Sequence, residues 1–171
     1  IPLLTMRLIS EEKRNQTMAL LVSAPISMMQ IIVGKFVAMT VFLCLILTLI
    51  AAMSLSLLFG GAIDLGLIFA NLCGLLLLGM AYSSIGIFVS CLTTHPVVAA
   101  VMTLAVFMGF WVIGLAASDP SSWLNWVSIS KRFEGFMDGY ISLPDVTFFL
   151  VVITLFIFLS VRKLDSERLS S

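Results

Sequence analysis

Charged residues are scarce in this sequence. Asp, Glu, Lys and Arg make up only 11% of its 171 residues, whereas a soluble domain carries about 25%, because its surface must face water. Hydrophobic residues make up 61%, and the mean hydropathy is +1.19. This composition excludes an ordinary soluble domain. The formal net charge of zero gives no indication of nucleic acid binding, and we expect no nucleic acid partner.

Residues that bind metals or form disulfides are also few. The three cysteines, Cys44, Cys73 and Cys91, all lie inside apolar runs. Their spacing fits neither a disulfide framework nor a metal motif, which favours small packing residues. The single histidine, His95, stands next to Pro96, where a structural or solvated residue is favoured over a proton relay. We therefore expect no metal and no cofactor bound by this chain.

Motifs for catalysis and nucleotide binding are absent as well. Ser83, Ser84 and Ser90 are available as nucleophiles, but His95 is the only base beside them and no Gly-x-Ser-x-Gly elbow occurs. No glycine loop ending in Lys-Ser or Lys-Thr is present to bind phosphates. The apolar runs contain no charged residue that would mark an ion-coupled transporter. An intramembrane enzyme is thus the weaker alternative, and we expect a chain without enzymatic activity.

Long uncharged runs are the main feature that is present. Residues 36–63 and 65–118 contain no Asp, Glu, Lys or Arg, and about 20 apolar residues suffice for a helix to cross a bilayer. Strands of a membrane barrel would alternate apolar and polar residues, which these runs do not. The sequence predicts an all-α membrane protein, a polytopic helical bundle. Its full spans are predicted at residues 35–59, 65–92, 97–117 and 146–161.

Polar segments separate these spans. Residues 1–9 are predicted to be the end of another span, and since the chain begins with Ile we expect a fragment that has lost its start. That gives about five spans here. Pro96 disfavours helix at His95 and predicts a hairpin corner. The other segments are predicted to be a polar region at 10–34, a long segment at 118–145 and a tail at 162–171.

The basic residues predict the orientation. If residues 10–34 are cytoplasmic, alternation of the spans places seven of the nine Lys and Arg residues in the cytoplasm together with the C-terminus. Only Lys131 and Arg132 then lie outside. This distribution follows the positive-inside rule. Trp111, Trp123 and Trp126 fall near the predicted outer interface, where tryptophan is enriched.

The region at 10–34 is predicted to hold a short amphipathic helix. Met18, Leu21 and Val22 recur at helical spacing before Pro25, and Ser27 followed by Gln30 predicts a capping box that opens the next helix. Two interpretations remain open from these residues. The helix rests on lipid headgroups, or it is a docking surface for a cytoplasmic partner.

Small residues recur in the second full span. Gly79 and Ser83, and again Gly86 and Ser90, are four residues apart. Such pairs permit close contact between helices in a membrane, so we expect them to pack against neighbouring helices.

A family resemblance bears on whether the region at 10–34 contacts lipid headgroups or a cytoplasmic partner. The run from Arg7 to Arg14, followed by Ala24-Pro25-Ile26-Ser27 and Gly34-Lys35-Phe36, resembles the signature of ABC-2 type permeases. It is most similar to the gliding-motility and copper-related (NosY-like) branch. The resemblance implies that the stretch is a cytoplasmic coupling region that contacts an ATP-binding subunit. The candidate coupling residues it implies are Glu11, Glu12, Lys13, Arg14, Thr17, Leu20, Leu21 and Pro25.

A second block, Phe133 to Val146, resembles the outer-face segment of the same family, which is expected to be helical and to lead into the last span. The candidate outer-face gate residues are Phe133, Glu134, Phe136, Asp138, Gly139 and Asp145. Glu134 and Asp138 are four residues apart, on one helical face. A solvated acidic face is favoured there over a metal or proton site, because no His or third carboxylate completes a ligand set.

The resemblance covers nearly the whole chain, so residues 1–171 are expected to form a single ABC-2 transmembrane domain with six spans in the intact subunit. It implies a permease subunit of an ATP-driven exporter in the bacterial inner (plasma) membrane. ATP and Mg²⁺ would be bound by a separate ATP-binding subunit. The other expected partners are a second permease copy or paralogue and membrane lipids. A non-transporting scaffold or sensor permease remains the alternative.

Overall fold

The computed structural model describes residues 2–15, 27–56, 64–116 and 128–170, all of which are helical apart from short connections. The helices are α1 (Pro2–Arg14), α3 (Met28–Ser56), α4 (Leu65–Leu92), α5 (Pro96–Ala116), α7 (Ile129–Met137) and α8 (Leu143–Ser170). The amphipathic helix predicted around Met18 lies outside the described residues. Four helices, α3, α4, α5 and α8, are long and apolar enough to cross a membrane. Helix α1, with 13 residues, is not among them, so a fifth span stays a prediction.

Helices α3, α4 and α5 begin where the sequence supplies a capping residue or an N-terminal proline. Ser27 and Gln30 form the predicted capping box, in which Gln30 N donates to Ser27 Oγ at 3.3 Å and Ser27 N to Gln30 Oε1 at 3.1 Å. Asp64 caps α4 by accepting a hydrogen bond from Gly66 N at 2.9 Å. Pro96 is the first residue of α5, a position where its missing N–H costs nothing. The predicted corner before Pro96 is therefore confirmed.

Helices α3 and α8 extend beyond the spans predicted from charge. Helix α3 begins at Met28 and includes Lys35, and α8 runs from Leu143 past Arg162 to Ser170. Charged residues mark where a helix leaves the hydrocarbon, whereas capping residues and turns decide where it ends. The helices are longer than the spans for that reason.

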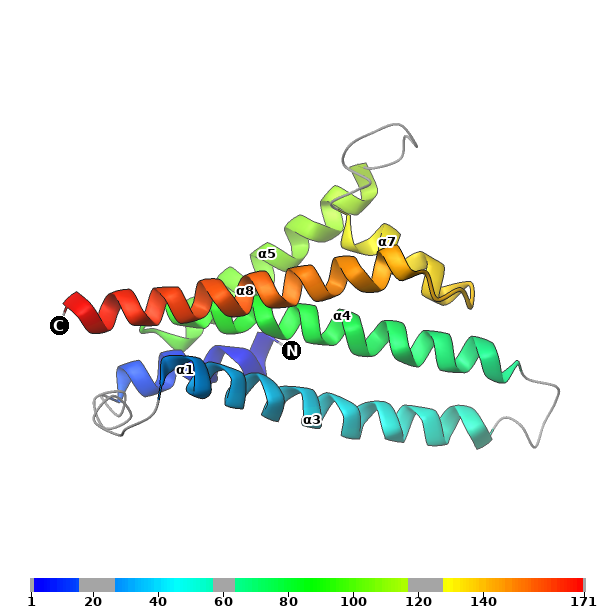
Figure 1. Ribbon diagram of the computed structural model, residues 1–171, viewed down its shortest axis with the longest axis horizontal. Coiled ribbons are helices and arrows are strands. Elements are labelled where there is room, and N and C mark those ends of the chain that lie inside the picture. The colour runs from blue at the N-terminus through cyan, green and yellow to red at the C-terminus, as the bar shows by residue number, and fades with distance from the viewer. Residues whose placement is uncertain (1, 16–26, 57–63, 117–127, 171) are drawn as a thin grey trace.

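Helix α4 is the centre of the bundle and contacts each of the other described helices. Figure 1 shows α3 and α8 alongside it, α1 beside its C-terminal half, and α5 diverging from it. Half of the most apolar window of α4 is buried, against 11% for α3 and α5 and 17% for α8. The side chains of α3, α5 and α8 that face away from α4 thus lie on the outside of the bundle.

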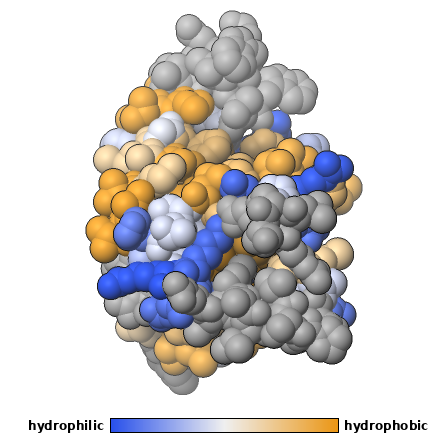
Figure 2. Space-filling view, turned by 90° about the vertical axis from the view of Figure 1, so that its left-hand side faces the viewer, coloured by the Kyte–Doolittle hydropathy of each residue, from blue (hydrophilic) through white to orange (hydrophobic). Residues whose placement is uncertain are grey.

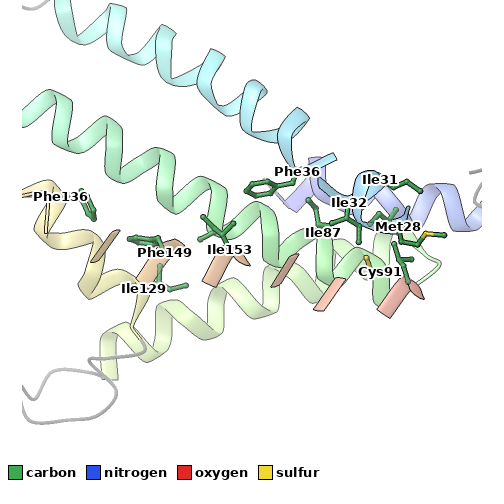
Figure 3. Close-up of a cluster of buried hydrophobic side chains, with 13 residues drawn as sticks. Met28, Ile31, Ile32, Phe36, Ile87, Cys91, Ile129, Phe136, Phe149 and Ile153 are labelled. Atoms are coloured by element: carbon green, nitrogen blue, oxygen red, sulfur yellow. The ribbon is translucent and has the colours of Figure 1, made fainter. Parts of the chain in front are cut away.

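One cluster of buried hydrophobic side chains forms the core between these helices (Figure 3). Near the C-terminus of α4, Ile32 and Met28 of α3 lie against Ile87 and Cys91. Near α7, Phe136 packs against Phe149 of α8 with ring centroids 6.3 Å apart.

The predicted close packing of small residues in α4 is confirmed, and each glycine serves a different neighbour. A Cβ atom at Gly74 would lie 2.6 Å from Phe136 Cβ of α7, and one at Gly86 would lie 2.4 Å from Thr5 Oγ1 of α1. At Gly79 the nearest atom is Leu43 Cδ1 of α3, at 3.1 Å. Because real Cβ atoms do not approach this closely, α1 and α7 sit where only glycine permits them.

Replacing Gly74 by Ala is expected to displace α7. Overpacking of this kind costs about 1–3 kcal/mol, which would appear as a lower midpoint of thermal unfolding for the purified protein in detergent. Gly109→Ala in α5 is the matched control, because nothing lies within 4 Å of a Cβ at that position. Equal unfolding midpoints for the two variants would contradict the packing described here.

Candidate functional site

Most of the described basic side chains of the bundle gather at one end, which we call the basic end. It holds the C-termini of α1, α4 and α8 and the N-termini of α3 and α5 (Figure 1). The described basic side chains there are Lys13, Arg14, Lys35, Arg162 and Lys163. Figure 2 looks onto this end and shows hydrophilic side chains grouped across it. At the opposite end, which we call the α7 end, only Lys131 and Arg132 are described.

Helix α1 is fastened to α4 at the basic end by a buried hydroxyl. Ser90 Oγ accepts hydrogen bonds from Ile9 N at 3.3 Å and from Ser10 N at 3.0 Å. Ile9, Ser10 and Ser90 are all fully buried. Since a polar group buried without a partner costs free energy, these bonds fix the position of α1 along α4.

Two lysines extend this attachment. Lys35 Nζ of α3 lies 2.5 Å from Glu12 Oε2 of α1 and also donates to the backbone oxygen of Leu8. Lys13 Nζ donates to the carbonyl oxygen of Cys91 at 2.5 Å. That carbonyl belongs to the last turn of α4, where a cation is favoured by the helix dipole and by the free carbonyls. Helices α1, α3 and α4 are thereby joined at one end.

The candidate coupling residues separate into different roles in this arrangement. Glu12 and Lys13 point into the bundle and hold it together. Arg14 is exposed at the end of α1. The side chain of Glu11, and all of Thr17, Leu20, Leu21 and Pro25, lie outside the described residues.

Sequence reasoning missed Lys35, Ser90 and the Cys91 carbonyl as members of this site. Lys35 did carry a signal, because it is a single charge that opens a long apolar run. A charge so close to the hydrocarbon core needs a partner. No pattern in the sequence pointed to the carbonyl oxygen of Cys91.

The α7 end is organised by a short capped helix. Ser128 Oγ accepts from Lys131 N at 3.3 Å at the start of α7. The helix stops at Asp138 and Gly139, where Gly139 N donates to Phe136 O and Tyr140 N to Gly135 O. This is the Schellman pattern. It requires the positive φ of Gly139, which is +84°.

An ion pair ties α7 to the start of α8. Arg132 Nη1 lies 2.8 Å from Asp145 Oδ1, and the two side chains are only 21% and 15% exposed. The guanidinium also lies over the ring of Phe148, 5.6 Å from its centroid, an arrangement that favours a cation. Charge-assisted bonds with little solvent access are the stronger kind.

The candidate gate residues around this ion pair differ in how deeply they are buried. Phe136 is fully buried between α4 and α8, and Phe133 is half-buried with its ring near Gly74. Glu134 and Asp138 are exposed. Among the described residues, no three His, Cys, Asp or Glu side chains lie close enough together to hold a metal ion.

Lys35→Gln is expected to lower the free energy of unfolding by about 1–3 kcal/mol, because the Glu12 carboxylate and the Leu8 carbonyl lose a charged donor. A double-mutant cycle with Glu12→Gln, followed by thermal unfolding, tests the pair directly. The double variant should lose less free energy of unfolding than the sum of the losses in the two single variants. Arg14→Gln is the control at an exposed position, and simple additivity of Lys35→Gln and Glu12→Gln would contradict the contact.

Asp145→Asn is expected to loosen α7 from α8, because Arg132 keeps its charge while its partner loses one. Amide hydrogen exchange in α7 should become about tenfold faster, equivalent to ~1.4 kcal/mol. Asp138→Asn, at the exposed end of the same helix, should leave the exchange rates nearly unchanged. Equal acceleration by both substitutions would contradict a specific role of the ion pair.

Comparison with known proteins identifies the family. The family model described as ABC-2 family transporter protein matches residues 2–125. This range includes α1 and three of the four long apolar helices, with Lys13, Arg14 and Lys35 of the basic end, and leaves out α7 and α8. No curated protein and no solved structure matches the chain significantly. The match extends over well more than half of the chain. This multi-pass membrane chain therefore belongs to the ABC-2 family of transporter membrane proteins.

Proposed function

We propose that this chain is the permease subunit of an ATP-driven exporter that couples to a separate ATP-binding subunit through its basic end. The observation that carries the proposal is the three-helix junction at that end. Glu12, Lys13 and Ser10 of α1 bind directly to α3 and α4, while Arg14 is exposed beside them. A force that the ATP-binding subunit applies to the end of α1 would therefore reach α3 and α4 through these contacts.

The basic end is the cytoplasmic end in this proposal. Five described Lys and Arg side chains lie there and two at the α7 end, as the positive-inside rule requires. The C-terminus of α8 is then cytoplasmic, in a bacterial inner membrane. The exposed cationic side chains are available to an acidic surface on the ATPase, for which Arg can form bidentate bonds.

Helix α4 is proposed to carry the movement across the membrane. It is held by α1 through Ser90 and Gly86, and it contacts α7 through Gly74. A shift of α4 on ATP binding would thus move the surface at Gly74 against which Phe136 packs. Small shifts of packed helices are a common element of such transitions. The outer-face residues, from Phe133 to Asp145, are proposed to form the gate that responds.

The chain itself supplies no chemistry in this scheme. ATP and Mg²⁺ are bound by the partner subunit, and a second permease copy or paralogue completes the pathway. A scaffold or sensor permease would keep the same junction and move no substrate, so flux across vesicles separates it from an exporter.

The test is co-purification of the full-length subunit from its native background, with and without Arg14→Glu. A Walker-motif ATPase is expected to accompany the unaltered protein, and Arg14→Glu is expected to lose most of it because the docking surface changes sign. Lys131→Glu reverses another exposed charge, at the α7 end, and should retain the ATPase.

Both variants must unfold at the same temperature as the unaltered protein for the comparison to count. Recovery of a folded protein without any ATPase would refute the coupling proposal. Retention of the ATPase by both variants would show that Arg14 is not part of the docking surface.

A further inference from the structure

Helix α1 changes its mode of attachment to the bundle at Ser10. Up to this point the side chains that face the bundle have no access to solvent, since both Thr5 and Ser10 are fully buried. Beyond it the burial falls away, and Arg14 is exposed. We call residues 2–10 the packed part of α1 and residues 11–14 the tethered part, because different contacts hold them.

The packed part is held by direct contact with the backbone of α4. A Cβ atom at Gly86 would lie 2.4 Å from Thr5 Oγ1 and 2.8 Å from Thr5 Cβ, so the two helices are as close here as glycine allows. Thr5 Oγ1 also donates to the carbonyl oxygen of Pro2 at 3.3 Å, and α1 contacts α5 as well. The packed part therefore cannot change its position on α4 without opening these contacts.

The tethered part is held by two lysine side chains. Lys35 Nζ of α3 lies 2.5 Å from Glu12 Oε2, and Lys13 Nζ donates to the Cys91 carbonyl oxygen of α4 at 2.5 Å. The charged group of a lysine stands at the end of a flexible stem. Such contacts can persist while the backbone of the tethered part moves, which the glycine contact of the packed part does not allow.

Ser90 lies at the boundary between the two parts and competes for the backbone hydrogen bonds of α1. Its Oγ accepts from Ile9 N at 3.3 Å and from Ser10 N at 3.0 Å. In a regular helix these two N–H groups donate to the carbonyl oxygens four residues earlier, those of Thr5 and Met6. Each N–H carries a single proton, so its bond to Ser90 weakens the bond within α1. A side chain that enters the hydrogen-bond ladder is one of the causes of helix bending.

The other buried serines of α4 do not act in this way. Ser83 Oγ donates to the Gly79 carbonyl oxygen and Ser84 Oγ to that of Ala81, each at 2.7 Å. Both bonds stay within α4. Among the buried serines of this helix, only Ser90 enters the ladder of a neighbour.

We propose that Ser90 is the pivot on which α1 bends when the ATP-binding subunit presses on its exposed end, a role that rests on the coupling function proposed above. The tethered part swings about Ile9 and Ser10, while the packed part stays with α4. The swing pulls α3 through the pair of Glu12 and Lys35, and the load on the pivot passes to α4. Ser90 is a positioning residue in this scheme, because it acts through α1.

The test follows the two parts of α1 separately in the full-length subunit bound to its ATP-binding subunit. Nitroxide labels on Asn15→Cys and Thr94→Cys report on the tethered part, and labels on Leu4→Cys and Thr94→Cys report on the packed part. All three side chains are exposed. The three native cysteines are replaced by Ala, and labelled subunits are diluted with unlabelled ones. Double electron–electron resonance then measures both distances with and without a non-hydrolysable ATP analogue.

The expected movement is small but measurable. Asn15 lies about 7.5 Å beyond Ser10 along the helix axis, so a bend of ~20° at the pivot moves it by about 2–3 Å. The ATP analogue should change the distance from Asn15 to Thr94 by this amount and leave the distance from Leu4 to Thr94 unchanged.

Two variants test whether Ser90 causes this difference. In Ser90→Ala the ladder of α1 is regular, and the difference between the two pairs of labels should disappear. Ser84→Ala is the matched control, because Ser84 is also fully buried in α4 but bonds within its own helix. It should behave as the unaltered protein does.

Equal changes in both pairs of the unaltered protein would overturn the pivot and leave the coupling function standing. A difference that persists in Ser90→Ala would also overturn the pivot, because the bend would then not depend on Ser90. No change in either pair of a complex that holds the ATP analogue would refute the coupling function together with the pivot.

A second measurement needs no variant at Ser90. Amide hydrogen exchange is read residue by residue in the unaltered complex, with and without the ATP analogue. Helical hydrogen bonds donated by residues 9–13 cross the pivot, whereas those donated by residues 6–8 lie within the packed part. Binding of the analogue should therefore speed exchange at residues 9–13 and leave residues 6–8 unchanged. Faster exchange along the whole of α1 would refute a pivot at this position.

Discussion

Close approach to α4 is the constraint on which the rest of this structure depends. Helices in a bilayer gain no hydrophobic free energy by associating, because lipid tails are as apolar as their side chains. Contact must come from packing, and α4 permits it through glycines at three levels, facing α7, α3 and α1 in turn. Helices α7, α3 and α1 pack at those levels, and α8 packs along α4 as well. Helix α5 diverges from α4 in Figure 1, and most of its surface lies on the outside of the bundle.

Polar groups inside the bundle follow a second requirement. Most buried hydroxyls donate to a carbonyl one turn earlier in their own helix, as Ser83 does to Gly79, Thr103 to Ala99 and Ser160 to Phe156, each at 2.7 Å. Such bonds satisfy the hydroxyl without joining two helices. Ser90 is different because it accepts from the backbone of α1. The polar contact between helices is thus concentrated at the basic end.

The two ends of α4 are held by different forces. At the basic end, α1 binds α4 through Ser90 and the Cys91 carbonyl oxygen, and one ion pair joins α1 to α3. At the α7 end, Phe136 rests on Gly74 and an ion pair secures α7 to α8. Between them, the α3–α4 contact gives way to an apolar groove beyond Leu43.

The sequence alone was enough to predict an all-helical membrane bundle, its four long apolar helices and the caps at Ser27 and Pro96, because charge scarcity, run length and capping chemistry are local properties. The family resemblance was likewise carried by short stretches of residues, now supported by the match over residues 2–125. The tertiary structure decided which charges point inward. Glu12 and Arg14 are two residues apart in one polar stretch, yet one pairs with Lys35 and the other is exposed. That difference depends on how α1 is rotated against α3 and α4, and the rotation is set by Ser90 and Gly86, far away in the sequence.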